Sequence, residues 1–278
     1  MYQRTTPRVF IVCPDDLGEL HDVEGGFQCA LCQRHFPSVN GIAELLPREA
    51  HQEASAENSQ LNAYSAGFSK RTDSAWRDYL GSCINLLGNG YLYSWAARTL
   101  EGIAGDQSLG ILDAACGDGI LRRYLPKRHH YVGIDFSARP LLRALRYNPA
   151  PYFRADLNHL PFAAETFDVV LSFQALQYLS RPEQALAQFA RVLKPGGKLL
   201  LTVPNDESFK YRLQGIPKIQ LQRFNRHNVP SLLARDFEVL NAKTRGLWVP
   251  TPFLSLHAPG VYPTRWGLSW SVVATPMK

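Results

Sequence analysis

The stretch that decides the fold is Ile111-Leu112-Asp113-Ala114-Ala115-Cys116-Gly117-Asp118-Gly119. Its first residues predict a buried strand, and the small residues after them predict a tight turn. Small side chains let a backbone approach a ligand closely, and the helix start that follows offers unpaired N–H groups. Asp135 lies 22 residues after Asp113, at the end of the next predicted strand, where an acid typically hydrogen-bonds the hydroxyls of a ribose. The stretch therefore predicts a nucleotide-binding α/β domain.

The sequence on either side of this stretch supports the same fold class. From Leu109 onward, short β-rich runs alternate with helical patterns, which predicts a parallel sheet covered by helices. Apolar residues at helical spacing predict a helix over 183–193, which ends at the Lys194-Pro-Gly-Gly turn. The predicted strands after the first are 132–135, 167–172, 198–203, 237–244 and 268–274.

The chain divides into three segments. Residues 1–50 are short apolar pieces separated by turn residues, which predicts a small β-rich unit. Residues 51–105 are helix-like and predict a helical cap or linker, while residues 106–278 hold the α/β domain. Because the chain has 278 residues, it is long enough for one large domain with a small addition.

Composition indicates an ordinary globular protein, with 45% hydrophobic and 19% charged residues. The sequence shows neither an apolar run of about 20 residues nor a convincing signal peptide, so we expect a cytoplasmic protein that does not enter a membrane. Five cysteines, an odd number, argue against a disulfide framework.

Charge is unevenly distributed. Residues 1–50 hold four arginines and seven acids, a net charge of −3. Because the whole chain has a net charge of +6, the remaining residues carry +9. A basic run consists of Arg122, Arg123, Lys127, Arg128, Arg139, Arg143 and Arg146. Such a run attracts an anionic partner such as RNA, or it forms the solvated face of helices. The solvated face is the more common of the two.

A dinucleotide-binding domain is the first alternative to consider for the glycine loop. Its fingerprint needs a third glycine, but Arg122 stands at that position after Gly117 and Gly119. Because a long side chain obstructs the close packing of helix and strand that the fingerprint requires, the dinucleotide interpretation is disfavoured.

Five motifs occur together in this order: LDAACGDG, VGID, ADLNHLPF, FDVVLS and ARVLKPGGKLLLTVPN. The region from about 85 to 274 that contains them resembles the class I methyltransferases, and within that class the group related to quinone-biosynthesis methyltransferases. The resemblance implies a Rossmann-like, seven-stranded, mostly parallel sheet with helices on both faces, and S-adenosylmethionine as cofactor. In one departure, Ala115 stands where the family usually has its first loop glycine, and alanine fits if the backbone angle φ is not strictly positive.

The resemblance also implies roles for individual residues. The cofactor's methionine part would be lined by Asp113, Ala115, Cys116 and Gly117. Asp135 would hold the ribose hydroxyls, and Phe136 would lie beside the adenine. The remaining implied contacts are Asp156 and the Leu157 N–H to the adenine ring, and Phe173 beside the reactive centre. Alternatively, Asp156 is a turn cap, and the two phenylalanines belong to the core.

Direct transfer of a methyl group requires a general base only if the acceptor must lose a proton. Candidate polar residues near the carboxyl edge of the sheet are Gln174, Gln177, Tyr178, Asn205 and His227. Since a glutamine cannot act as a base, His227 is our candidate, although a capping or surface role is the more common one for such a histidine.

Cysteines near the amino terminus form a second candidate site. Cys13-x-x-Asp16 and Cys29-x-x-Cys32 resemble the two knuckles of a zinc ribbon, with Asp16 in place of the fourth cysteine. The resemblance implies a zinc site made of these four residues, for which His21 and His35 are conceivable substitute ligands. The alternative is a degenerate ribbon whose cysteines serve as small buried hydrophobic residues.

Three functions follow from these patterns. The leading hypothesis is an S-adenosylmethionine-dependent methyltransferase with a small-molecule acceptor, in which tail aromatics could wall the pocket. These aromatics are Trp248, Phe253, Tyr262 and Trp266. The second is an rRNA base methyltransferase, which the basic run supports and the acidic amino-terminal unit does not. The third is a non-catalytic binding or activator protein that has lost its cofactor.

Overall fold

A computed structural model describes residues 11–49, 75–249 and 256–277. The prediction of helix over 51–74 lies outside these ranges. The described remainder of that segment is a single long helix, α3 (Ala75–Ala104).

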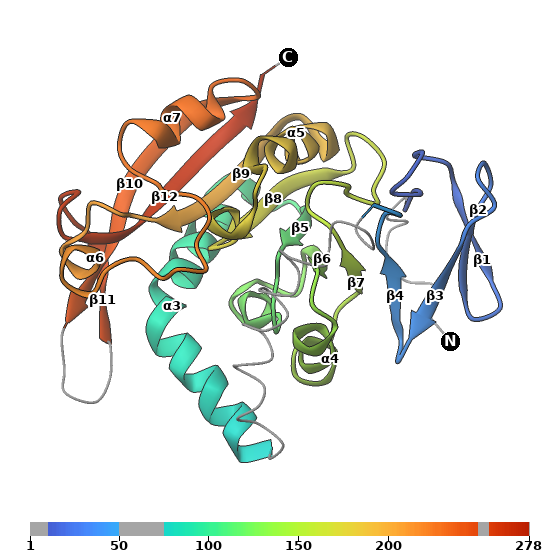
Figure 1. Cartoon of the computed structure of the whole chain (residues 1–278), viewed down its shortest axis with the longest axis horizontal. Helices are drawn as coiled ribbons and strands as arrows, with labels where there is room; N and C mark the ends of the chain where they lie inside the picture. Colours follow the sequence, from blue (N-terminus) through green and yellow to red (C-terminus); the bar gives the residue numbers. More distant parts are fainter. Residues whose placement is uncertain (1–10, 50–74, 250–255, 278) are drawn as a thin grey trace.

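Seven strands form the central sheet and confirm the predicted α/β fold (Figure 1). They are β5 (Gly110–Ala114), β6 (His130–Asp135), β7 (Tyr152–Ala155), β8 (Phe167–Phe173), β9 (Leu193–Pro204), β10 (Phe237–Val249) and β12 (Gly267–Pro276). Their order in space is β7-β6-β5-β8-β9-β12-β10, in which only β12 runs antiparallel to its neighbours. The order reverses beside β5, so the loop after β5 lies at a topological switch point, where open α/β sheets bind ligands.

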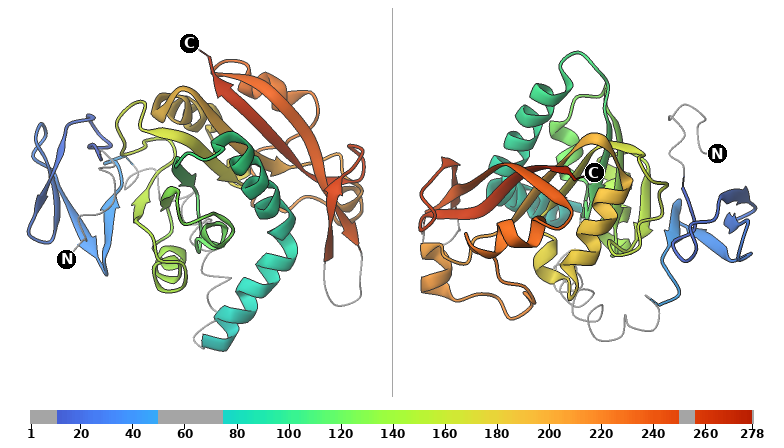
Figure 2. Two further views of the ribbon diagram at one scale, coloured as in Figure 1. Left: turned by 180° about the vertical axis from the view of Figure 1, so that it is seen from behind. Right: turned by 90° about the horizontal axis from the view of Figure 1, so that it is seen from above.

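Helices cover both faces of this sheet, as predicted. Besides α3, they are η1 (Ile120–Tyr124), α4 (Ala138–Tyr147), η2 (Leu176–Tyr178), α5 (Pro182–Val192) and α7 (Asn228–Leu233). The short helix α6 (Phe209–Gln214) has no buried residue. Along β8, Val170 packs in one apolar cluster with α5 and α7, while Val169 and Leu171 pack in another with α3, η1 and α4. The two clusters alternate because successive side chains of a strand point to opposite faces. Seen from behind, α3 crosses one face of the sheet (Figure 2).

The amino-terminal unit is β-rich, as predicted, but it continues the central sheet. It consists of β1 (Leu20–Val23), β2 (Gly26–Cys29), β3 (His35–Val39) and β4 (Ile42–Leu45), each antiparallel to the next. β4 pairs in parallel with β7, with Glu44 opposite Arg154, so the unit lies beyond the β7 edge (Figure 1). At the opposite end of the sheet, β11 (Leu256–Val261) pairs with β10. The sheet of the described residues therefore has twelve strands.

One local element differs from the expectation. The glycine loop is followed by η1, a short 3₁₀ helix of five residues, instead of an α-helix. Pro126 explains the early end, since proline lacks an N–H and forces the residue before it out of the helical region. Leu125 accordingly has φ −92° and ψ 135°, and the Arg122 guanidinium donates to the carbonyls of Leu125 and Pro126.

In the described part of the chain, no helix combines the length and the apolar character that crossing a membrane requires.

Candidate functional site

The glycine loop lies at the carboxyl end of β5 and is held against β6. The backbone N–H groups of Ala115 and Cys116 both donate to the carbonyl of Ile134, at 2.9 and 2.8 Å. Gly119 N–H closes the turn by donating to the carbonyl of Cys116 at 3.0 Å. The loop therefore has a fixed shape before any ligand arrives.

Ala115 has φ 71°, in the left-handed region. Alanine would replace a glycine here without cost only if φ were negative, and the positive φ of Ala115 does not meet this condition. A non-glycine residue in this region costs about 1–2 kcal/mol. The loop keeps its shape in spite of this strain, because the neighbouring backbone bonds fix it.

The loop glycines serve two different purposes. A Cβ at Gly117 would meet nothing within 4 Å, so the backbone there faces open space. A Cβ at Gly119 would collide with the Tyr152 hydroxyl, and one at Gly133 would lie 2.9 Å from Cys116 Sγ. Gly119 and Gly133 therefore permit close packing, while Gly117 leaves backbone accessible to a ligand.

Asp135, at the end of β6, closes the next part of the site. Its Oδ2 accepts the Gly117 N–H at 3.0 Å, and its Oδ1 accepts the Ser137 N–H at 2.8 Å. Burial raises the pKa of Asp135, and these two hydrogen bonds oppose the rise. A carboxylate oxygen has two lone pairs, so each oxygen retains capacity for a further donor such as a ribose hydroxyl.

Asp113 lies beneath the loop and is 2% exposed. Its Oδ2 accepts the Tyr131 hydroxyl at 2.6 Å. Burial, opposed by that hydrogen bond and reinforced by Asp135, raises the pKa of Asp113 to about 7. The carboxyl group is therefore poised to ionise when a cation binds nearby.

Phe136 follows Asp135 and is partly exposed. The Arg154 guanidinium lies 5.6 Å from the centre of its ring and donates from Nε to the Phe136 carbonyl at 2.8 Å. Arg154 Nη1 in turn lies 3.0 Å from Glu44 Oε2, on β4 of the amino-terminal unit. Neither Glu44 nor Arg154 stands out in the sequence, because only the pairing of β4 with β7 brings them together.

Asp156 and Leu157 follow β7. Asp156 Oδ1 accepts the Asn158 N–H at 2.9 Å, which is the turn-capping role considered as an alternative. Its Oδ2 lies 3.9 Å from His159 Nδ1, and Asp156 raises the pKa of His159. Leu157 is buried in the core. Contacts of both residues with adenine stay a prediction.

Phe173 ends β8 and packs against α3. Its ring stacks on Tyr93 at 6.4 Å and on Trp95 at 5.9 Å between centres. Tyr124 of η1 adds a further ring, 5.5 Å from that of Tyr93. The aromatic group made by Tyr93, Trp95, Tyr124 and Phe173 therefore joins the end of β8 to the helical segment. Among the predicted tail aromatics, Phe253 lies outside the described residues.

Most of the polar candidates at this edge of the sheet have structural partners. The Asn205 amide donates to the carbonyls of Thr264 and Gly267, at 2.5 and 2.6 Å. Gln174 donates to Thr202 Oγ1 at 3.3 Å, and the buried Gln177 donates to the Gln174 carbonyl at 2.8 Å. Gln177 Oε1 has no partner among the described residues.

His227 lies on the surface at the start of α7. Its Nε2 accepts from Arg226 at 3.1 Å, and its backbone N–H donates to Asn225 Oδ1 at 2.8 Å. The structure thus brings Asp113, the glycine loop, Asp135 and Phe136 together, whereas it records no contact between these residues and His227. A catalytic role for His227 stays a prediction.

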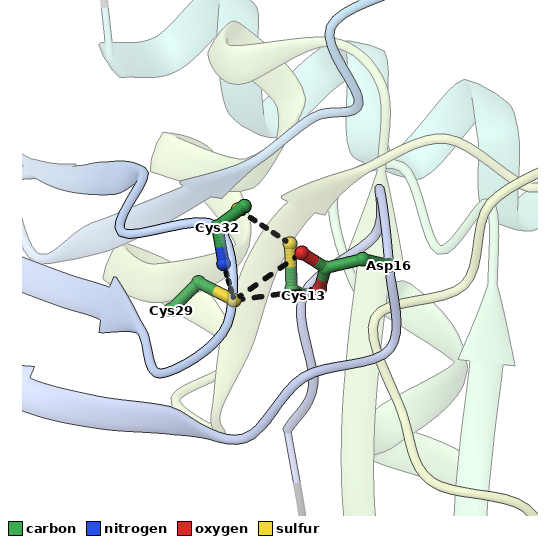
Figure 3. Close-up of side chains that lie close together, drawn as sticks. All are labelled: Cys13, Asp16, Cys29 and Cys32. Carbon is green, nitrogen blue, oxygen red and sulfur yellow. Dashed lines mark hydrogen bonds between the residues drawn. The ribbon is translucent and has the colours of Figure 1, made fainter.

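The second candidate site is in the amino-terminal unit (Figure 3). The side chains of Cys13, Asp16, Cys29 and Cys32 point toward one another, and one ligand atom from each lies within 4.8 Å of all the others. Cys13 and Cys29 are fully buried. The hydrogen bond from Gly18 N–H and those from the cysteines lower the pKa of Asp16 to about 2, so this side chain is a carboxylate. His21 and His35 are exposed and are not part of this cluster.

The strand order, the glycine loop and the acid after the next strand define a class I methyltransferase fold. Residues 112–201 match the family model described as a methyltransferase domain. The chain therefore contains a methyltransferase domain of class I, and S-adenosylmethionine is the cofactor that this domain implies.

Curated relatives match the same region. A malonyl-[acyl-carrier protein] O-methyltransferase of Erwinia pyrifoliae is 30% identical over 49% of this chain and 58% of its own length. A ubiquinone biosynthesis O-methyltransferase of Hahella chejuensis is 35% identical over 38% of this chain and 48% of its own length. The chain thus spans about half the length of these relatives.

Solved structures show the same fold. A SAM-dependent methyltransferase from Thermotoga maritima aligns with a TM-score of 0.51 at 19% identity, over 69% of this chain and 91% of its own. A chain from the complex of the Haloferax volcanii Trm112 methyltransferase activator with a methyltransferase aligns with a TM-score of 0.53 at 17% identity, over 72% of this chain and 96% of its own.

Proposed function

We propose that the protein transfers a methyl group from S-adenosylmethionine to a small-molecule acceptor. The observation that carries this proposal is the hydrogen bond from the Gly117 N–H to Asp135, beside an open stretch of backbone. This hydrogen bond places the Asp135 carboxylate, which has spare lone pairs, next to a loop that a ligand can approach, at the switch point of the sheet. The residues present therefore fit the cofactor that the fold implies.

S-adenosylmethionine supplies an activated methyl group, so the protein's own contribution is to bind, orient and exclude water. Asp135 would hold the ribose, and Phe136, backed by Arg154, would lie beside the adenine. The loop from Ala115 to Gly117 would enclose the methionine part above Asp113.

The aromatic group of Tyr93, Trp95, Tyr124 and Phe173 would border the acceptor, since it is anchored on the end of β8. The names of the relatives indicate acceptors with a reactive oxygen, on a quinone precursor or an acyl group. Where such an acceptor must lose a proton, His227 is our candidate base. We expect the reaction to take place in the cytoplasm.

The RNA alternative receives less support from the basic run. Arg122 is bonded to two backbone carbonyls, Arg123 to Asn148, and Arg128 to Glu101 at 2.6 Å. These guanidinium groups already have partners within the chain, so they offer less charge to a phosphate backbone. RNA stays a hypothesis that the acceptor screen tests directly.

The test is production of S-adenosylhomocysteine by the purified full chain with phenolic, carboxylate and RNA acceptors. We expect turnover with a small phenol or carboxylate, reduced at least about 100-fold in Asp135→Ala, because two charge-assisted bonds to the ribose are lost. Asp106→Ala, an exposed acid outside the site, is the matched control and should keep full activity. Turnover with RNA alone would overturn the choice of acceptor, and equal turnover by Asp135→Ala would overturn the site.

A further inference from the structure

Two turns in the amino-terminal unit have the same hydrogen bonds. In the first, Leu17 N–H donates to the Cys13 carbonyl at 2.9 Å, and Cys13 N–H to the Gly18 carbonyl at 2.8 Å. In the second turn, Gln33 N–H donates to the Cys29 carbonyl at 3.1 Å, and Cys29 N–H donates to the Arg34 carbonyl at 3.0 Å.

The backbone angles of the two turns agree as well. Leu17 has φ 61° and Gln33 has φ 58°, so each turn has a left-handed residue at its fifth position. Asp16 therefore occupies the position in the first turn that Cys32 occupies in the second. Its carboxylate is placed by the backbone where the matching turn places a sulfur atom.

Two of the separations between the donor atoms match those of a tetrahedral ion, and all the donor atoms lie within 4.8 Å of one another. A tetrahedron with Zn–S of about 2.3 Å and Zn–O of about 2.0 Å requires separations of roughly 3.8 Å between sulfurs and roughly 3.5 Å between sulfur and oxygen. Cys13 Sγ lies 3.8 Å from Cys32 Sγ, and Asp16 Oδ1 lies 3.4 Å from Cys29 Sγ.

The surroundings of the cluster also suit bound thiolates. Cys29 Sγ accepts the backbone N–H groups of Leu31 at 3.3 Å and Cys32 at 3.4 Å, and such bonds stabilise negative charge on sulfur. A Cβ at Gly18 would lie 2.8 Å from Cys29 Sγ and 3.0 Å from Asp16 Oδ1. The backbone at Gly18 is thus packed against two of the ligand atoms and Leu31 too closely for a side chain.

We propose that Cys13, Asp16, Cys29 and Cys32 bind one Zn²⁺ ion in a closed tetrahedral site. Three sulfur ligands favour zinc over the harder cations magnesium and calcium. With four protein ligands the site has no open position, so its role is structural. The ion joins the turn that follows Val12, whose N–H donates to the Pro161 carbonyl at 3.0 Å, to the turn between β2 and β3. The site thereby steadies the unit that carries β4.

The test is metal content and affinity of the full chain, purified under reducing conditions. We expect about one zinc per chain by mass spectrometry, and absorption of tetrahedral thiolate–cobalt when Co²⁺ replaces it. Asp16→Cys should retain the ion, whereas Asp16→Ala should weaken binding at least about tenfold in chelator competition. Asp22→Ala, an exposed acid on β1, is the matched control and should change nothing.

Other outcomes would overturn the proposal. One is less than about 0.1 zinc per chain after growth and refolding with zinc. A disulfide between Cys13 and Cys32 in the native protein is another, since it would consume two ligands. Equal affinity in Asp16→Ala would show that the carboxylate is not a ligand. If Asp16→Ala fails to fold, protection of the three thiols from alkylation by added zinc in the unaltered chain still decides the matter. None of these measurements depends on methyl transfer.

Discussion

Ala115 is the residue at which this chain departs most clearly from a glycine-rich cofactor loop. Its φ of 71° is forced by the two N–H groups that share the Ile134 carbonyl. The sequence could show the substitution, but not its backbone angle, because the angle follows from pairing with β6. The strain therefore became visible only in the structure.

We predict that Ala115→Gly raises the free energy of unfolding by about 0.5–1 kcal/mol. Relief of left-handed strain exceeds the entropy that glycine gains in the unfolded chain. Ala114→Gly is the matched control: it lies buried in extended β5 and should lower that free energy by about 1 kcal/mol or more. Urea unfolding checks both signs, and a loss of stability in Ala115→Gly would contradict the argument.

The raised pKa of Asp113 leads to a prediction of how cofactor affinity depends on pH. Its pKa of about 7 leaves much of the carboxyl protonated in the free protein at neutral pH. Bound S-adenosylmethionine is cationic and favours the carboxylate, so binding lowers this pKa and releases a proton. Affinity should therefore rise with pH, by up to about tenfold per unit, and level off above about 7.

Calorimetry in buffers of different ionisation enthalpy measures the released proton. Because the Tyr131 hydroxyl holds the Asp113 pKa down, Tyr131→Phe should move the levelling-off to higher pH. An affinity that is constant between about pH 5 and 8 would refute this role of Asp113.

At the scale of elements, strands were predicted best. β5, β6 and β8 are buried runs with clear turn residues at their ends, and local sequence suffices to find them. For β9 the predicted run 198–203 is the buried second half of the strand, which begins at Leu193 and includes the Lys194-Pro-Gly-Gly segment predicted as a turn. The pairing of β4 with β7 was not predictable, because register between segments about 110 residues apart is set by tertiary packing. For this reason the sequence did not indicate the ion pair of Glu44 and Arg154.

Pairing of β4 with β7 leads to a prediction for the adenine side of the site. Arg154→Met keeps an unbranched apolar stem but removes the guanidinium group with its bonds to Phe136 and Glu44. We expect the Kd for S-adenosylmethionine to rise about three- to tenfold with kcat nearly unchanged, because Phe136 loses its support while the reacting groups stay in place.

Arg146→Met, an exposed arginine on α4, is the matched control and should leave the Kd as it is. Glu44→Gln should give a smaller rise than Arg154→Met, since the amide oxygen can still accept a hydrogen bond. A fall in kcat without a change in Kd would place the effect of Arg154 elsewhere.

At the scale of the whole molecule, one continuous strand order links the amino-terminal unit, the methyltransferase domain and the closing strands. The fold could be predicted because five motifs agree in order and spacing. The acceptor could not be predicted, because the aromatic residues around Phe173 come from α3 and η1. The packing of these two helices on β8 is a tertiary property. His227 lies on the surface at the start of α7, which is the alternative that the sequence also indicated, and bonds to its neighbours Asn225 and Arg226 hold it there.

Titration calorimetry of the full chain with S-adenosylmethionine, beside Asp135→Ala and Asp106→Ala, measures whether the glycine loop and Asp135 bind the cofactor. We expect one site per chain with a Kd on the order of micromolar, kept in Asp106→Ala and lost in Asp135→Ala. Absence of both binding heat and thermal stabilisation at about 1 mM S-adenosylmethionine would contradict this expectation, as would an unchanged Kd in Asp135→Ala.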